Sequence, residues 1–210
     1  MIEQVTIFGA NGAVGREVVA EALARGYQVV AFVHRRSQLE ASPQLRIVQG
    51  DVYKPEDVDA ALEGSDSVIS ALGSWGTPTK DVLTVGMRHI ISGMRRHGVR
   101  RIVSLTGSEA RASGDHLGLI HHVMHVLLGV VASKVLRDSE QHIAQLESSN
   151  LDWTVIRSPI MSSRPAQTTG YRLTMKRSLP WSTVSRHHVV LALLDTLHDR
   201  TWKQKAPFVA

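Results

Sequence analysis

The sequence predicts an α/β fold, in which one domain is built on a doubly wound parallel sheet with helices on both faces. Three observations support this expectation. Short β-branched segments alternate with amphipathic segments along nearly the whole chain. The first strand turns through glycines directly into a helix. The 210 residues contain no repeat and no linker, and this length suits a single domain, here 1–210, with a substantial core.

Composition excludes several classes of function. There are no cysteines, which rules out disulfides, thiolate catalysis and cysteine-bound metal. The first residues run directly into a strand without a signal-peptide pattern, and no apolar run reaches membrane-spanning length. We therefore expect a cytoplasmic protein without a membrane partner. The net charge is +5, but the arginine pairs are scattered at element ends without aromatic partners, so nucleic-acid binding is not expected.

The glycine-rich turn near the N-terminus carries the strongest functional signal. Val5 to Phe8 reads as a buried strand, Gly9, Gly12 and Gly15 follow, and 16–25 has the apolar spacing of a helix. A strand that turns through glycines into a helix presents free N–H groups and the positive end of the helix dipole. In this context the spacing predicts a dinucleotide site, with the pyrophosphate close to Gly12.

The end of the second strand, Gln28 to Val33, bears on the choice of dinucleotide. An acidic residue there would bind the ribose 2′-hydroxyl of NAD, whereas this chain has His34, Arg35, Arg36 and Ser37. Guanidinium groups offer bidentate donors that suit a 2′-phosphate. The sequence thus favours NADP over NAD as the cofactor, and a solvated basic turn is the alternative.

The next two strands add further candidate contacts. Asp51 follows a third strand, Leu45 to Val48, and is placed either to accept from the adenine amino group or to precede the helix that starts near Pro55. A fourth strand, 67–71, leads into the loop 72–76 over the expected crevice, where Trp75 flanks a ligand or packs on a helix.

The middle of the chain continues the pattern with a long helix, 80–97, and a fifth strand, 101–105, followed by Thr106, Gly107 and Ser108. The apolar segment 114–131 carries four histidines, of which His121 and His125 would share a helix face. That spacing can bind zinc, but no acidic or cysteine ligand lies close in the sequence, so no metal site is expected. The segment is either a substrate lid or an oligomer contact.

The remaining elements complete the sheet. We expect a helix at 134–149 capped by Asn150, a strand at 151–157, a polar loop from Ser158 through Pro165, a short strand at 170–174, a helix at 187–197 and a last strand at 207–209. A small substrate region would be formed by 108–133 and 158–185.

Several fragments taken together resemble one family. They are Ile7 to Gly15, Gly50 to Val52, Val68 to Gly73, Gly98 to Val103 and Ser149 to Arg157. The chain resembles the atypical short-chain dehydrogenases/reductases with NAD(P)H-binding, NmrA-like architecture, and within them the flavin reductase/biliverdin-IXβ reductase branch most. The resemblance implies a Rossmann fold and hydride transfer from NADPH to a flavin or a linear tetrapyrrole.

The resemblance also implies roles for individual positions. Gly9, Asn11, Gly12, Ala13 and Val14 would hold the pyrophosphate; Arg35 and Arg36, beside His34, the 2′-phosphate; Asp51 and Val52 the adenine; Ala71, Leu72 and Gly73 the ribose; and Thr106, Gly107 and Ser108 would lie near the nicotinamide. Thr106 and Ser108 are the candidate catalytic groups, and helix capping is the alternative role of Ser108.

The chain departs from the family at the chemistry. No tyrosine has a lysine four residues later, and Val135 and Ser139 fall near the places of the superfamily's proton-donating Tyr-x-x-x-Lys pair. The branch's active-site histidine falls near Pro159. Hydride transfer to a flavin, quinone or similar planar acceptor depends mainly on positioning, and so suits this site better than bilin reduction. The alternatives are a non-catalytic NADP(H) sensor whose partner or second copy docks on the apolar helix 117–131, and an epimerase- or dehydratase-like enzyme.

Overall fold

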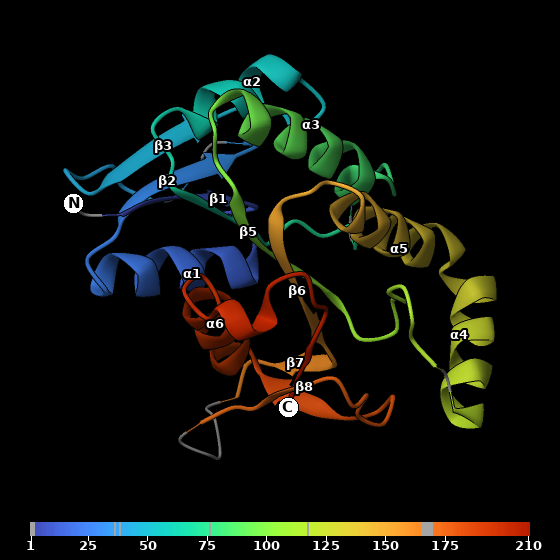
Figure 1. Cartoon of the computed structure of the whole chain (residues 1–210). Coiled ribbons are helices and arrows are strands. Elements are labelled where there is room, and N and C mark those ends of the chain that lie inside the picture. Colours follow the sequence, from blue (N-terminus) through green and yellow to red (C-terminus); the bar gives the residue numbers. More distant parts are fainter. Residues whose placement is uncertain (1–2, 36, 38, 76, 117, 165–169) are drawn as a thin grey trace.

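The computed structural model describes residues 3–35, 37, 39–75, 77–116, 118–164 and 170–210, and these ranges form one layered α/β unit (Figure 1). The main sheet contains β1 (Gln4–Phe8), β2 (Gln28–Val33), β3 (Leu45–Gln49), β4 (Ser67–Ser70), β5 (Arg101–Gly107), β6 (Asp152–Ser158), β8 (Leu173–Thr174) and β10 (Phe208–Val209). Its strand order is β3-β2-β1-β4-β5-β6-β10-β8. The strands pair in parallel except at the β10–β8 edge, which is antiparallel. The predicted doubly wound parallel sheet is confirmed.

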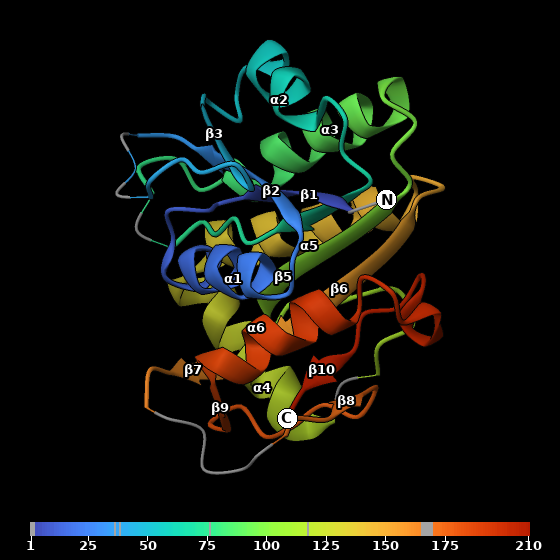
Figure 2. The same cartoon turned by 90° about the vertical axis from the view of Figure 1, so that its left-hand side faces the viewer.

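Helices cover both faces of this sheet (Figure 2). They are α1 (Ala13–Ala24), α2 (Pro55–Leu62), α3 (Val82–Arg96), α4 (Leu119–Val131), α5 (Ser133–Glu147) and α6 (Arg186–Asp195), with a 3₁₀ turn at Arg200–Trp202. In Figure 1, α1 and α6 lie on one side of the sheet and α2, α3 and α5 on the other. A separate parallel pair, β7 (Ile160–Ser162) with β9 (Thr183–Ser185), lies beyond the end of β6.

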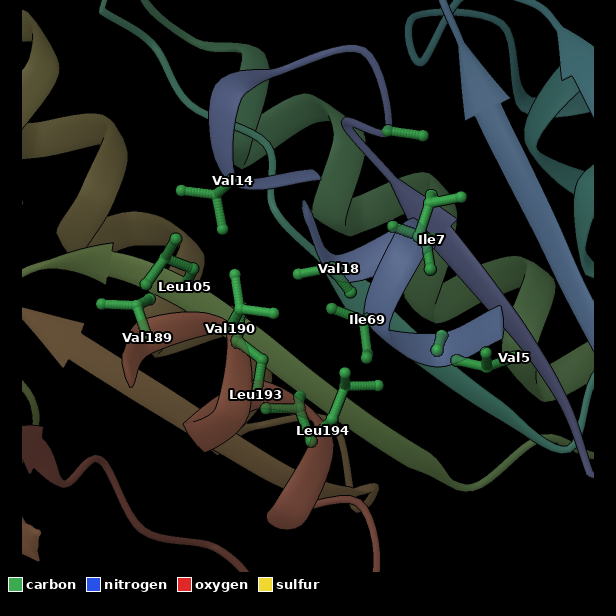
Figure 3. Packing of buried hydrophobic residues seen from close by; sticks show 14 of the residues in the cluster. Val5, Ile7, Val14, Val18, Ile69, Leu105, Val189, Val190, Leu193 and Leu194 are labelled. Atoms are coloured by element: carbon green, nitrogen blue, oxygen red, sulfur yellow. The ribbon is translucent and has the colours of Figure 1, made fainter. Parts of the chain in front are cut away.

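Alternating side chains of the strands pack into two hydrophobic cores, one on each face of the sheet. Val5 and Ile7 of β1 point toward α1 and α6, where they meet a cluster that includes Val18 and Leu193 (Figure 3). Phe8, on the opposite face, belongs to the cluster under α2, α3 and α5. This period-2 division explains why nearly every residue of these central strands is buried, since both faces are covered.

Three elements differ from the sequence-based expectation. Helix α3 begins at Val82 rather than at 80. The Asp138 carboxylate of α5 accepts hydrogen bonds from the backbone N–H groups of Leu83 and Thr84 and so caps the N-terminus of the helix there. Helix α4, expected over 117–131, begins at Leu119, after Gly118. The loop expected from Ser158 contains the strand β7, whose register is set by β9, a partner distant in sequence.

Helix α4 stands apart from the layers, at 115° to α5 (Figure 1). None of its residues is fully buried. Its large apolar side chains face outward, with exposed fractions of 50–81%, and they are Leu119, Ile120, Val123, Val126, Leu127, Val130 and Val131. Within the described ranges, no single helix has the length and apolar character needed to cross a bilayer, and α4 and α5 meet those criteria only as a bent pair.

Candidate functional site

The turn after β1 has the geometry that a pyrophosphate requires. Gly9 has a φ of +78°, and a Cβ there would lie 2.6 Å from the carbonyl oxygen of Ala71. A Cβ on Gly15 would lie 2.1 Å from the carbonyl oxygen of Gly9, so the first turn of α1 packs directly on the loop. Gly12 is the N-cap of α1 and no side chain caps it. The first N–H groups of α1, from Ala13 and Val14 onward, are therefore available to an anion.

Asn11 links this turn to the loop after β2. Its side-chain amide donates to the backbone oxygen of Arg35 at 3.2 Å, and its oxygen accepts from the Ser37 hydroxyl at 2.7 Å. The Ser37 hydroxyl oxygen in turn accepts from the backbone N–H of Leu39. The side chain expected to hold the pyrophosphate is thus engaged in positioning the basic loop, and sequence reasoning gave no signal for this contact.

The basic loop lies beside the third strand's end. His34 is exposed, and its Nδ1 lies 3.9 Å from a carboxylate oxygen of Asp51. Asp51 accepts from the backbone N–H of Tyr53, and Val52 is buried. Arg35 is exposed, while Arg36 lies outside the described residues. The structure therefore brings the expected 2′-phosphate and adenine residues together at one edge, and their roles stay predictions.

The loop after β4 closes the other side of the glycine turn. Ala71 donates its N–H to Phe8 at 2.9 Å, and Ala71 and Leu72 are half-buried. Gly73 is exposed and has open space around its Cα. Trp75 is exposed and packs on no helix core. This places Ala71 and Leu72, two of the three expected ribose residues, directly against Gly9 at the ends of β1 and β4.

A pocket of about 360 Å³ lies farther along this connection, between the start of α3 and α5. Its lining consists of Pro78, Thr79, Lys80, Asp81, Lys134, Arg137, Asp138 and Gln141. The residues expected to hold the dinucleotide are absent from this lining. Asp138 is buried and also accepts from the Ser74 hydroxyl, so it fixes the loop that carries the expected ribose contacts.

The end of β5 presents the candidate catalytic residues. Thr106 and Ser108 are both buried, and the Thr106 hydroxyl finds no hydrogen-bond partner among the described residues. Ser108 donates its N–H to the Ser158 carbonyl at 2.8 Å, which ties β5 to β6. Ser108 does not cap the next helix, because the N-cap of α4 is Gly118. The unengaged Thr106 hydroxyl at a strand end fits a ligand-facing role.

A buried ionic cluster lies immediately beyond these strand ends. The Arg157 guanidinium is fully buried and donates to both carboxylate oxygens of Asp115, and Arg177 donates to Asp115 at 2.9 Å. Burial raises the pKa of Asp115, but hydrogen bonding and charge from Arg157 outweigh it and lower the net value. Burial, then the charge of Arg157, lowers the pKa of Arg177. Arg177 also donates to the Ser108 carbonyl, so the cluster supports the candidate catalytic strand end.

Helix α5 carries the positions where the superfamily's Tyr-x-x-x-Lys pair is absent. Val135 is half-buried and Ser139 is buried. One turn on, His142 is completely buried, and burial lowers its pKa to about 4. Its Nδ1 donates to the Ser139 carbonyl and its Nε2 accepts from the Ser104 hydroxyl. This neutral histidine joins α5 to β5, and its partners lie too far apart in sequence for a pattern to reveal them.

Two of the three histidines of α4, His121 and His125, point inward. His121 Nδ1 lies 3.7 Å from Glu109, and His125 Nε2 lies 3.7 Å from Glu140. Among the described residues no group of three or more potential ligands could hold a metal ion. Because α4 and the pair β7–β9 fall within 108–133 and 158–185, the expected substrate region is a set of real elements beside the strand ends, and its role stays a prediction.

A model of one protein family matches residues 9–200, and that family is described as NAD(P)H-binding. The chain belongs to the NAD(P)H-binding family. The match spans the glycine turn, the basic loop and the strand ends described above, and it confirms the family expected from the sequence motifs. This places the chain among NAD(P)H-binding proteins of oxidoreductase type and leaves the choice between NADP and NAD open.

Individual relatives show how far the likeness extends. The photosystem II assembly factor Ycf39 of Synechocystis is 30% identical over 105 residues, which cover 48% of this chain and 32% of that protein. The chain spans between 32% and 58% of the length of the first curated relatives it matches.

Solved structures share the fold at low identity. A short-chain dehydrogenase/reductase from Veillonella parvula in complex with NADP superposes with a TM-score of 0.79 at 20% identity, covering 100% of this chain and 95% of that one. An anaerobilin reductase from Escherichia coli O157:H7 gives 0.77 at 18% identity, covering 98% and 96%. These likenesses establish the Rossmann-like fold of the chain.

Proposed function

We propose that this NAD(P)H-binding protein is an NADPH-dependent reductase that transfers hydride to a planar acceptor such as a flavin or a quinone. The observation that carries the proposal is the tight glycine turn, where a Cβ on Gly9 would lie 2.6 Å from the Ala71 carbonyl oxygen and one on Gly12 would lie 3.1 Å from the Gly9 carbonyl oxygen, and which leads into an N-terminus of α1 that no side chain caps. That geometry suits a pyrophosphate. When bound, the dinucleotide supplies the hydride.

The choice of NADPH rests on the loop after β2. Arg35 is exposed, and its backbone oxygen is held by Asn11, so the loop has a fixed place relative to the glycine turn. His34 beside it adds a second basic side chain, and none of the positions 34–37 carries a carboxylate. A guanidinium at this point favours a 2′-phosphate over a free 2′-hydroxyl.

The acceptor is proposed from the catalytic pair that the chain lacks and from the elements that lie beside the strand ends. Without a Tyr-x-x-x-Lys pair, polarisation of a carbonyl by a phenol is unavailable, whereas transfer to a planar acceptor depends on orientation. The strand ends supply the Thr106 hydroxyl, and α4 with β7 and β9 flanks them.

The cofactor assignment is tested by Arg35→Ala. We expect NADPH affinity to fall about 10-fold, which corresponds to the loss of about 1.4 kcal/mol from a charge-assisted contact, while NADH affinity stays unchanged. Fluorescence titration with both dinucleotides measures this. His198→Ala, an exposed histidine near the opposite ends of the strands, is the matched control for loss of a basic side chain. Equal effects of Arg35→Ala on NADPH and NADH would refute the NADP assignment.

Turnover is tested by steady-state NADPH oxidation with FMN, FAD and quinones. Oxidation that saturates with one of these acceptors supports the reductase. Tight binding without oxidation supports the second candidate, a non-catalytic NADP(H)-binding regulator. The observation that favours this alternative is the outward apolar face of α4, which offers a partner surface on a protein lacking the superfamily's usual acid.

A further inference from the structure

Three buried polar atoms beyond the end of β5 have no hydrogen-bond partner among the described residues. They are both carboxylate oxygens of Glu109 and Nδ1 of His121. Glu109 follows Ser108 directly, and His121 comes from the first turn of α4. The imidazole nitrogen lies 3.7 Å from the nearer carboxylate oxygen, and the two side chains are only 13% and 15% exposed. Buried polar groups left without hydrogen bonds are rare and call for a specific explanation.

The charged groups around this pair leave Glu109 and His121 facing each other. Arg177 lies 4.0 Å from Glu109, but it also donates to Asp115 and to the Ser108 carbonyl, so it only partly balances the Glu109 charge. Arg157 is fully engaged with Asp115. On the other side, His125 faces Glu140 of α5 and the Glu109 carbonyl oxygen. Glu109 is therefore the carboxylate that His121 faces, at a distance that a small side-chain rotation would close.

The pair lies at the edge of the sheet where the reaction is expected. In open α/β sheets ligands bind beyond the carboxyl ends of the strands. Glu109 lies two residues past the end of β5 and directly follows Ser108, whose N–H donates to the Ser158 carbonyl at the end of β6. A carboxylate that faces an imidazole is a common arrangement for a group that gives up or takes a proton near neutral pH.

We propose that Glu109 and His121 form the proton-donating pair of this site, in the place of the missing tyrosine and lysine. The inference rests on the proposed reductase function. Hydride from NADPH adds two electrons and one hydrogen to the acceptor, and the protonated His121 imidazole gives its proton to the acceptor atom that gains negative charge. The resulting neutral imidazole takes up a proton from solvent, and Glu109 stabilises its charged form and orients the ring.

The first test is His121→Asn, with His122→Asn as the matched control, because His122 is exposed on the same helix. With the acceptor that supports wild-type turnover, we expect kcat to fall about 10²-fold in the His121 variant, in the range that general acids contribute. The affinity for NADPH, measured by fluorescence titration, and the circular dichroism spectrum are expected to match those of the His122 variant. Unchanged kcat in His121→Asn would overturn the inference.

The second test separates chemistry from packing. In the wild type, kcat is expected to fall as the pH rises, because the charged imidazole is the donor. Glu109→Gln keeps the side-chain shape but removes the charge that favours the imidazolium, so the fall should move to lower pH. A purely structural role would lower kcat equally at every pH, and that result would also overturn the inference.

The reductase function and the Glu109–His121 proton-donating pair are contradicted by different results. If the wild type oxidises NADPH and both variants keep its rate and pH profile, the reductase stands and the proton-donating pair is wrong. If the wild type binds NADPH without oxidising it in the presence of any acceptor tried, the reductase and the pair fall together.

Discussion

At the scale of single residues, the site is held by buried polar groups whose partners come from distant parts of the chain. Asp138 caps the N-terminus of α3 by accepting hydrogen bonds from two backbone N–H groups, and it also accepts one from the Ser74 hydroxyl. His142 joins α5 to β5 through its hydrogen bond with Ser104. Each is a polar side chain on an otherwise amphipathic helix, where a sequence pattern predicts an exposed position. Only the three-dimensional pairing shows that they lie inside.

His142 makes stability depend on pH. Its pKa is lowered from 6.5 to about 4 by burial, so the unfolded chain binds a proton that the folded chain does not. The contribution is fully present above pH 6.5 and is lost as the pH falls toward 4, by up to about 3 kcal/mol. Urea unfolding at several pH values measures the loss. His142→Gln is expected to be less stable at pH 7 and to lack this part of the pH dependence, and parallel profiles for the two proteins would contradict the assignment.

At the scale of elements, the sequence was sufficient wherever a local pattern decides the structure. The β-branched runs predicted the central strands, and the glycine spacing predicted the turn into α1, where Gly9 and Gly15 meet backbone atoms at distances that exclude a side chain. The pair β7–β9 was missed because each strand has only three residues and its register depends on the other. The Asn11 contact to the basic loop was missed for the same reason, since it joins residues 24 and 26 positions apart.

Helix α4 is oriented opposite to what its amphipathic pattern predicts, because its histidine-bearing side faces the protein and its apolar side faces solvent. His121 and His125 point to Glu109 and Glu140, while the aliphatic side chains face outward. A helix of 13 residues without a buried side chain gains little from tertiary packing, and isolated helices of this length are marginal.

We therefore expect the amides of α4 to exchange with solvent much faster than those of α3, which buries eight residues. Hydrogen–deuterium exchange followed by mass spectrometry in dilute solution resolves the two helices. Protection of α4 that equals that of α3 at the lowest concentration would contradict this expectation. Protection that appears only as the concentration rises would identify a second copy as the cover of the apolar face.

At the scale of the whole molecule, one buried cluster joins segments from the second half of the chain. Arg157 of β6 donates to Asp115, which precedes α4, and to the Ala206 carbonyl before β10, while Arg177 lies between β8 and β9. The Phe208 ring of β10 lies against both guanidinium groups, 3.8 Å and 4.8 Å from their central carbons. The fold of this edge of the sheet thus depends on the Asp115 carboxylate.

Asp115→Asn is expected to destabilise the protein by about 3 kcal/mol, because it leaves a fully buried guanidinium without a counter-charge. Asp59→Asn is the control, since Asp59 pairs with Arg96 in an exposed position where the loss should be under about 1 kcal/mol. Thermal and urea unfolding measure both. Equal losses in the two variants would show that the buried cluster does not carry this edge of the fold.

The tether between Asn11 and the basic loop has a consequence for redesign of the cofactor preference. It sets the spacing between the pyrophosphate turn and the ribose edge before any ligand arrives. Replacing Arg35 by an acidic side chain would therefore change the charge at a fixed position, and the spacing would be kept. Replacing Asn11 instead would remove its hydrogen bonds to the loop, and we expect it to lower the affinity for both NADPH and NADH. Under the proposed assignment, Arg35 would set the preference between the dinucleotides, whereas Asn11 fixes the place of the loop.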